Sequence, residues 1–181
     1  MDPGATYTIE TRKDVLTRTV LIQYADRMWE TLGPIFHEQG SWHNQLKYRS
    51  DTFFLIEYVT PSGDRPGFLL YEQTKSYTWI WLLHVNKSYR RQGVAASLFQ
   101  HVQIQNLALA TGASTSNKLA KRFYEKQKPD HYGIRKEEWH SSTLYGWNVD
   151  LKNFDCDKVY SSGGSHKKWG KEMFLFWRCQ L

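Results

Sequence analysis

The sequence has few cysteines and no long apolar run. Cys156 and Cys179 are the only cysteines, which is too few for a disulfide framework, and no Cys/His cluster has the spacing of a zinc site. No apolar run approaches the roughly 18 residues that suggest a transmembrane helix. The first six residues, MDPGAT, have neither the basic n-region nor the apolar h-region of a secretory signal. We therefore expect a cytoplasmic protein with reduced cysteines, no metal site and no membrane association.

Length and composition favour one domain with a substantial core. The 181 residues are 40% hydrophobic and 15% aromatic, which is typical of a globular domain rather than of a disordered chain. No internal repeat or linker divides the sequence, so we expect a single domain over residues 1–181. The formal net charge of +6 favours anionic partners, because a basic surface attracts them from a distance.

Residues 77–95 combine a strand pattern with a basic turn. Residues 77–85 are an apolar strand candidate, a polar turn follows at 86–89, and the sequence RRQGVA at 90–95 opens an apolar helical run. The first N–H groups of a helix have no intrahelical partner, and the helix dipole favours negative charge there. Gly93 permits close approach of a ligand to the backbone, and arginine forks suit phosphate. The sequence therefore predicts a phosphate-binding turn at 90–95.

A second segment, residues 117–126, has Asn117 and Ala120 ahead of Tyr124. The two segments together, in this order, resemble the GCN5-related N-acetyltransferase (GNAT) family. The turn is similar to the pyrophosphate motif Arg/Gln-x-x-Gly-x-Gly/Ala, and the later segment to a helix in which Asn and Ala precede Tyr. The resemblance implies an α/β (α+β) fold, the GNAT fold, with a central, mostly antiparallel mixed sheet flanked by helices and splayed at the acetyl-CoA site.

The resemblance also implies an acyltransferase that uses acetyl-CoA as cosubstrate. In the family, the backbone of the strand before the turn binds the pantetheine arm, the Asn contacts that arm, and the Tyr hydroxyl lies near the thioester sulfur. The coenzyme-binding residues so implied are Leu83, His84, Val85, Arg90, Arg91, Gln92, Gly93, Val94, Ala95, Asn117 and Tyr124.

Acetyl transfer needs a proton for the leaving thiolate and a neutral amine. Tyr124 is the candidate acid, because a phenol with a pKa near 10 can protonate a thiolate. Many relatives have a Glu on the strand before the turn, whereas residues 77–85 include no carboxylate. His84 on that strand and Glu72 at the end of the preceding one are candidate bases. The alternatives are an acceptor α-amine of low pKa and proton loss through water.

Hydrophobic patterns place further elements. We expect strands at 7–10, 52–59 and 67–72, with a hairpin turn at 61–64, and a helix at 14–32. After Val94 two readings are open. A helix ends near Ala110 with Gly112 as its C-terminal stop, leaving 113–116 as a short strand, or it ends near Gln103 and 107–114 is the strand. We favour the first.

The last two strands are expected at 143–149 and 173–178. The polar segment 152–171 between them is too long for a hairpin loop, and we expect it to overhang the acceptor side. Its lysines include Lys167 and Lys168, which suit an anionic acceptor. The alternative is an insertion without a role.

The favoured acceptor is a primary amine on a macromolecule, a protein lysine or N-terminus, because a basic surface repels polyamines. The alternatives are the α-amine of an aminoacyl-tRNA, as in the toxin branch of the family, and a non-catalytic protein that binds coenzyme A or a partner. The second alternative rests on the short 113–116 strand and on the absence of the family's Gly-Phe after Tyr124. A homodimer also remains open.

Overall fold

A computed structural model of the chain describes residues 7–11, 23, 53–74, 76–106, 108–136 and 141–149. The chain forms two compact units, Met1–Gln73 with Ile80–Asn106, and Thr74–Trp79 with Leu107–Leu181. Strand β4 (Thr78–Val85) therefore begins in the second unit and continues in the first. The helix expected at 14–32, apart from the helical residue Gln23, and the segments 152–171 and 173–178 lie outside the described residues.

The first unit contains the strands β1 (Thr8–Thr11), β2 (Phe53–Val59) and β3 (Gly67–Gln73), followed by most of β4, in that order across the sheet. β1 pairs with β2, and β2 with β3, in antiparallel register. The turn between β2 and β3 is closed by a hydrogen bond from the Gly63 N–H to the Thr60 carbonyl at 2.9 Å. These elements confirm the strands and the hairpin turn predicted from the sequence.

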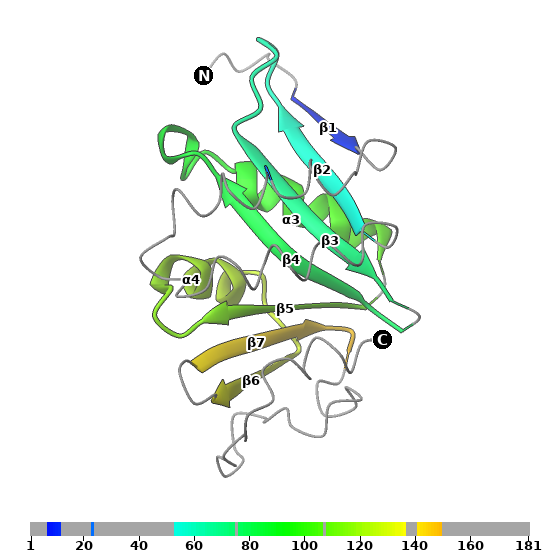
Figure 1. Ribbon diagram of the computed structural model, residues 1–181, viewed down its shortest axis with the longest axis vertical. Coiled ribbons are helices and arrows are strands. Elements are labelled where there is room, and N and C mark those ends of the chain that lie inside the picture. Colours follow the sequence, from blue (N-terminus) through cyan, green and yellow to red (C-terminus); the bar gives the residue numbers. More distant parts are fainter. Residues whose placement is uncertain are drawn as a thin grey trace. The chain divides into compact units, whose positions relative to one another are not determined.

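Helix α3 (Val94–Gln105) follows the 3-10 helix η3 (Lys87–Tyr89) and lies across one face of the first unit's sheet, behind β2 and β3 in Figure 1. Gly67 on β3 allows the start of α3 to come close. A Cβ at Gly67 would lie 2.8 Å from Val94 Cγ1 and 3.0 Å from the His84 carbonyl oxygen. The absence of a side chain at Gly67 thus fixes where α3 begins relative to β3 and β4.

The favoured prediction that the helix continues to Ala110 is wrong. α3 ends at Gln105, where the Asn106 side chain caps it by donating to the Val102 carbonyl at 2.7 Å. Strand β5 (Leu109–Ser114) follows, and its buried first residues, Leu109 and Ala110, pair with β7. Sheet pairing and burial override the helix propensity of this Ala/Leu stretch. The alternative reading, a strand at 107–114, is confirmed.

The second unit contains β5, helix α4 (Lys118–Lys126), β6 (His131–Lys136) and β7 (Ser141–Trp147). The strand order is β5-β7-β6, with both pairings antiparallel, and α4 contacts β5 (Figure 1). β7 confirms the strand predicted at 143–149. Its neighbours are β5 and β6, and β6 was missed in the sequence.

Candidate coenzyme-binding turn and acyl-transfer residues

The predicted phosphate turn lies between η3 and α3 and has an unusual backbone. Arg91 and Gly93 have left-handed φ angles of 64° and 87°. The Tyr89 N–H donates to the Asn86 carbonyl at 2.9 Å and the Arg90 N–H to the Lys87 carbonyl at 3.3 Å. Left-handed Gly93 directly precedes the right-handed helix α3. Such a step turns successive N–H groups toward one concave side, which is a common anion-binding arrangement.

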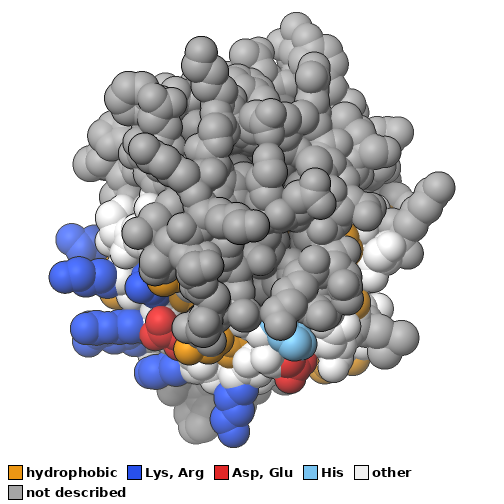
Figure 2. All heavy atoms as spheres, turned by 90° about the horizontal axis from the view of Figure 1, so that it is seen from below, with side chains coloured by type: hydrophobic (Ala, Val, Ile, Leu, Met, Phe, Trp, Pro, Cys, Tyr) orange, Lys and Arg blue, Asp and Glu red, His pale blue; other side chains and the backbone are white. Residues whose placement is uncertain are grey.

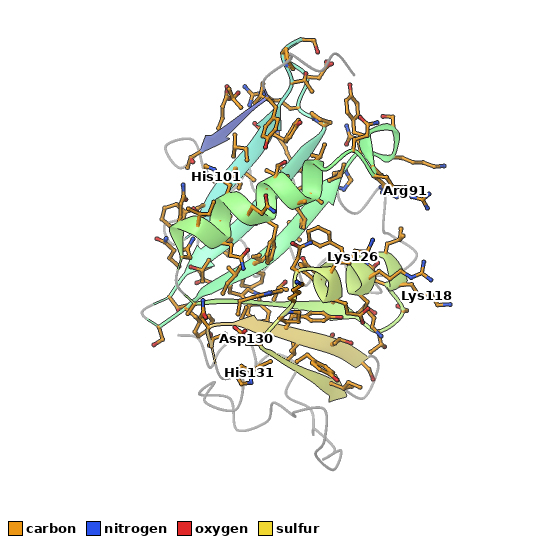
Figure 3. All side chains as sticks on the ribbon, turned by 180° about the vertical axis from the view of Figure 1, so that it is seen from behind. Arg91, His101, Lys118, Lys126, Asp130 and His131 are labelled. Carbon is orange, nitrogen blue, oxygen red and sulfur yellow. The ribbon has the colours of Figure 1, made fainter. Side chains whose placement is uncertain are left out.

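Two side chains of the turn stabilise it by hydrogen bonds to nearby backbone carbonyls. Arg90 Nε donates to the Val85 carbonyl at 3.1 Å, and Gln92 Nε2 donates to the Ser88 carbonyl at 2.9 Å. The Arg90 guanidinium is therefore tied to the end of β4, and its terminal nitrogens remain as donors. Arg91 is exposed and extends from the turn (Figure 3).

The N-terminus of α3 has N–H donors that precede the first hydrogen bond of the helix. The first hydrogen bond of the helix runs from the Ser97 N–H to the Gly93 carbonyl at 2.9 Å, so the N–H groups of residues 94–96 come before it. The first turn has no acidic residue, and a Cβ on Gly93 would meet no atom within 4 Å. These features are those of a seat for phosphate.

Along β4, the regular alternation of side chains between the two faces of the sheet is interrupted between Trp81 and His84. Trp81 Nε1 donates to Glu72 Oε2 at 3.0 Å, and His84 stacks on Phe68 with ring centroids 5.3 Å apart. Phe68 and Glu72 are four residues apart on β3 and share a face, whereas positions three apart on a regular strand face opposite sides. The alternation therefore shifts by one residue, as at a β-bulge. A bulge leaves backbone groups of the strand outside the ladder, and the half-buried Leu83 belongs to this stretch of β4.

The two candidate bases are both buried and both hydrogen-bonded. His84 is 5% exposed, and its Nε2 lies 3.1 Å from Asn86 Oδ1. Glu72 is also 5% exposed and accepts the hydrogen bond from Trp81. Gly67 faces α3, so its neighbour Phe68 lies on the opposite face of the sheet. His84 and Glu72 share the face of Phe68 and therefore lie opposite α3.

Asn117 and Tyr124 lie on α4 in the second unit. Asn117 caps the helix, because its Oδ1 accepts from the Ala120 N–H at 3.1 Å. Tyr124 is 5% exposed, and its ring lies 5.4 Å from that of Tyr145 and 6.3 Å from that of Trp147. Burial raises the pKa of the Tyr124 hydroxyl to about 12, and a hydrogen bond between its side chain and that of Thr111 lowers it in part.

The structure thus groups the predicted residues in two places. The residues of β4 and of the turn, with Glu72, belong to the first unit, and Asn117 and Tyr124 belong to the second. The sequence reasoning missed two partners, Asn86 for His84 and Thr111 for Tyr124. Neither has a recognisable signal, since both bonds depend on side chains that meet only after folding.

The described residues include no candidate metal site and no candidate membrane span. No cluster of three or more His, Cys, Asp or Glu side chains is arranged to hold a metal ion there. Within the same residues, no helix has both the length and the hydropathy to cross a bilayer.

Comparison with known proteins connects this geometry to one family. Residues 49–127, which include β2 to α4, match the family model described as "Acetyltransferase (GNAT) domain". A sequence search against curated proteins finds no match.

Solved structures show the same fold at low sequence identity. A protein of Desulfovibrio desulfuricans described as a GNAT-family acetyltransferase is 13% identical, with a TM-score of 0.60 over 80% of this chain and 100% of its own. The ribosomal-protein-S18-alanine N-acetyltransferase of Escherichia coli is 16% identical, with a TM-score of 0.59 over 82% and 98%. NAA60 of Arabidopsis thaliana, solved with a bisubstrate analogue, is 16% identical, with a TM-score of 0.54 over 79% and 100%. The predicted GNAT fold is confirmed.

Proposed function

We propose that this chain, whose residues 49–127 match the GNAT acetyltransferase domain model, transfers acetyl from acetyl-CoA to a primary amine of a protein, either an N-terminal α-amine or a lysine. The observation that supports coenzyme binding best is the turn at residues 90–95. It combines left-handed Gly93, a helix N-terminus without a carboxylate and two arginines. The pyrophosphate of coenzyme A meets both the N–H donors and the positive charge there.

In the transfer, the neutral amine nitrogen attacks the thioester carbonyl carbon. A C–N bond forms, the C–S bond breaks, the amine loses a proton, and the coenzyme thiolate receives one. Backbone groups of β4 between Trp81 and His84 would orient the acyl arm by main-chain hydrogen bonds, since a bulge frees groups that a regular ladder would occupy.

Tyr124 supports thiolate departure mainly as a hydrogen-bond donor. A pKa of about 12 keeps the phenol protonated at neutral pH. Full transfer to a thiolate with a pKa near 8.5 is uphill by roughly 5 kcal/mol at 1.36 kcal/mol per unit. The phenol therefore stabilises the developing negative charge on sulfur through a hydrogen bond, and the proton that the amine releases balances the one that coenzyme A takes up as it leaves.

The residues of β4 favour an acceptor with a low pKa. A lysine with a pKa of about 10.4 costs roughly 4 to 5 kcal/mol to deprotonate at pH 7, whereas an α-amine near pKa 8 costs about 1 kcal/mol. β4 has no carboxylate, and the candidate bases His84 and Glu72 already have hydrogen-bond partners. An N-terminal α-amine is therefore our first choice within the protein acceptors. One of the similar structures, the ribosomal-protein-S18-alanine N-acetyltransferase, is named for acetylation of a protein, which agrees with a protein acceptor.

The test is acetyl-CoA turnover with four acceptors side by side: peptides with a free N-terminus, peptides with an acetylated N-terminus and an internal lysine, aminoacyl-tRNA, and spermidine. We expect the free N-terminal peptides to react fastest and spermidine slowest. Preferential turnover of aminoacyl-tRNA would move the chain to the tRNA-modifying branch. Absence of turnover with all four would contradict the proposed activity.

A further inference from the structure

Helix α4 has an exposed basic face that the coenzyme turn and the acyl-transfer residues do not explain. Lys118, Arg122 and Lys126 are exposed and follow one another at four-residue steps, and Lys121 is half-buried beside them. Four-residue steps place the three cations on one side of the helix, about 6 Å apart along its axis. Figure 3 shows Lys118 and Lys126 extending from α4, and Figure 2 shows Lys and Arg side chains gathered along one side of that view.

Within the part of the chain that the structure describes, no acidic side chain pairs with this face. None of the four basic side chains forms an ion pair with a described residue, and the one acidic residue of the helix is the exposed Glu125. Like charges at four-residue steps cost about 0.2 to 0.5 kcal/mol per pair. Lys118 and Lys121 also lie at the end of the helix where the dipole disfavours cations. Lys126 lies at the other end of α4, where the dipole favours a cation, so the cost falls on the first turns. An anionic partner accounts for the cations there better than folding does.

Exposed apolar side chains lie on the same side of the second unit. Tyr132 and Ile134 on β6 are 51% and 37% exposed. Tyr132 is the cross-strand partner of Tyr145 on β7, and Tyr145 packs against Tyr124 of α4. Cross-strand partners share a face of the sheet, so Tyr132 and Ile134 are on the face that α4 covers. Leu119, 62% exposed, adds an apolar contact among the cations.

We propose that the basic face of α4 and the exposed side chains of β6 form a binding surface for single-stranded nucleic acid. Evenly spaced cations suit a phosphate backbone, and an exposed aromatic ring offers a stacking platform for an unpaired base, which a duplex does not present. An acidic polypeptide would use the cations but would not need the ring. The proposal concerns binding alone and does not depend on the acceptor of the acetyl group.

The test measures binding of a fluorescently labelled 15-nucleotide oligouridine RNA by anisotropy across a salt series, with acetyl-CoA in excess throughout. The test variant is Arg122→Gln with Lys126→Gln, which removes two cations distant from Asn117. The matched control is Gln100→Glu with Ile104→Glu on α3, where both positions are exposed; it changes the net charge by the same amount elsewhere. We expect the test variant to bind roughly tenfold more weakly at moderate salt, with a salt slope reduced by about 1.4, while the control binds nearly as the parent does.

A second variant tests the aromatic platform without altering charge. Tyr132→Leu should weaken RNA binding roughly tenfold at an unchanged salt slope, because it removes stacking and no phosphate contact. Thermal melts with acetyl-CoA confirm that each variant is folded. The proposal is overturned if the parent does not bind the RNA at low salt, if test and control variants weaken binding equally, or if Tyr132→Leu binds as the parent does. A parallel titration adds acetyl-CoA to the parent protein with RNA already bound. The proposal is also overturned if acetyl-CoA displaces the RNA there, which would assign the cations to the coenzyme site. Tighter binding of polyglutamate of equal charge would likewise overturn it and would indicate an acidic protein partner.

Discussion

Tyr124 and Tyr145 are two neighbouring phenols that burial affects alike. The pKa of each hydroxyl is raised to about 12, chiefly by desolvation, and the negative charge of Glu125 adds to the rise at Tyr145. They differ in their partners. Tyr124 shares a hydrogen bond with the Thr111 side chain. Thr143 moderates the pKa of Tyr145, yet no described group meets the Tyr145 hydroxyl with hydrogen-bond geometry. The pair therefore provides a matched test of the acid role.

Tyr124→Phe should lower kcat by about 10- to 1000-fold while the KM for acetyl-CoA stays nearly constant, because the change removes one hydroxyl and keeps the ring. Steady-state kinetics on both substrates measures this. Tyr145→Phe is the control, and its kcat should match that of the parent. Equal kcat values in Tyr124→Phe and the parent would remove Tyr124 from the mechanism and leave it as a core residue.

The raised pKa of Tyr124 also predicts how stability depends on pH. Between pH 10 and pH 12 the unfolded chain loses this proton while the folded chain keeps it, so the free energy of unfolding falls as the pH rises through that window. A rise of two units corresponds to about 3 kcal/mol. Urea unfolding at pH 9, 10 and 11 should therefore show a smaller decline in Tyr124→Phe than in the parent. Parallel declines would mean that the hydroxyl is solvated in the folded protein.

At the scale of elements, the position of α3 depends on Gly67. Gly67→Ala places a methyl group 2.8 Å from Val94 Cγ1 and 3.0 Å from the carbonyl oxygen of His84. Because a backbone atom cannot move aside easily, we expect a loss of about 1 to 3 kcal/mol in the free energy of unfolding. Affinity for acetyl-CoA should fall as well, since the start of α3 is displaced.

The comparison for this change is Gly112→Ala on β5. Its new methyl group would meet Leu144 Cδ2 at 3.1 Å, the end of a flexible side chain that can shift. Urea unfolding should show a smaller loss than for Gly67→Ala, and coenzyme affinity should stay at the parent value. If the two variants lose the same stability and affinity, the close approach at Gly67 is not what sets the start of α3.

A comparison of the individual strands and helices shows which of them could be predicted from the sequence. Short, nearly continuous apolar and aromatic runs predicted β2, β3, β4 and β7, because most residues of these strands are buried. The end of α3 was misjudged because Ala and Leu after Asn106 suit a helix locally, and only their pairing with β7 makes them a strand. β6 was missed because its exposed Tyr132 and Ile134 give no core pattern.

The part of the candidate site that local backbone conformation determines could be predicted from the sequence. A basic turn with Gly ahead of an apolar helix predicts an anion seat, and Gly93 has the left-handed φ that this turn requires. The partners of His84 and Tyr124, and the shift in β4 that brings Trp81 and His84 to one face, arise from contacts between strands. Contacts of this kind produce no recognisable residue spacing in the sequence, so they could not be predicted from it.

At the scale of the whole molecule, the net charge of +6 predicts how acceptors are chosen. Turnover of an acidic protein acceptor should weaken as salt rises, because screening removes the long-range attraction. Turnover of a short neutral peptide should change little over the same range. Initial rates between 50 and 300 mM salt measure both. A neutral peptide as salt-sensitive as the acidic protein would show that charge acts on the coenzyme rather than on the acceptor.

The central claim is that coenzyme A binds through the turn at Gly93, and one matched pair of variants tests it directly. Gly93 and Gly63 have φ angles of 87° and 88°, and a Cβ at either would meet no atom within 4 Å. Gly93→Val and Gly63→Val therefore strain the backbone alike, and only the first places a side chain in the path of the pyrophosphate.

The measurement is the shift in thermal unfolding caused by acetyl-CoA at about 100 times its Kd. Binding at this level stabilises the folded chain by about 2.7 kcal/mol, which corresponds to roughly 5 to 10 °C for a protein of this size. The account predicts this shift for the parent and for Gly63→Val, and none for Gly93→Val. An equal shift in all three proteins would contradict it.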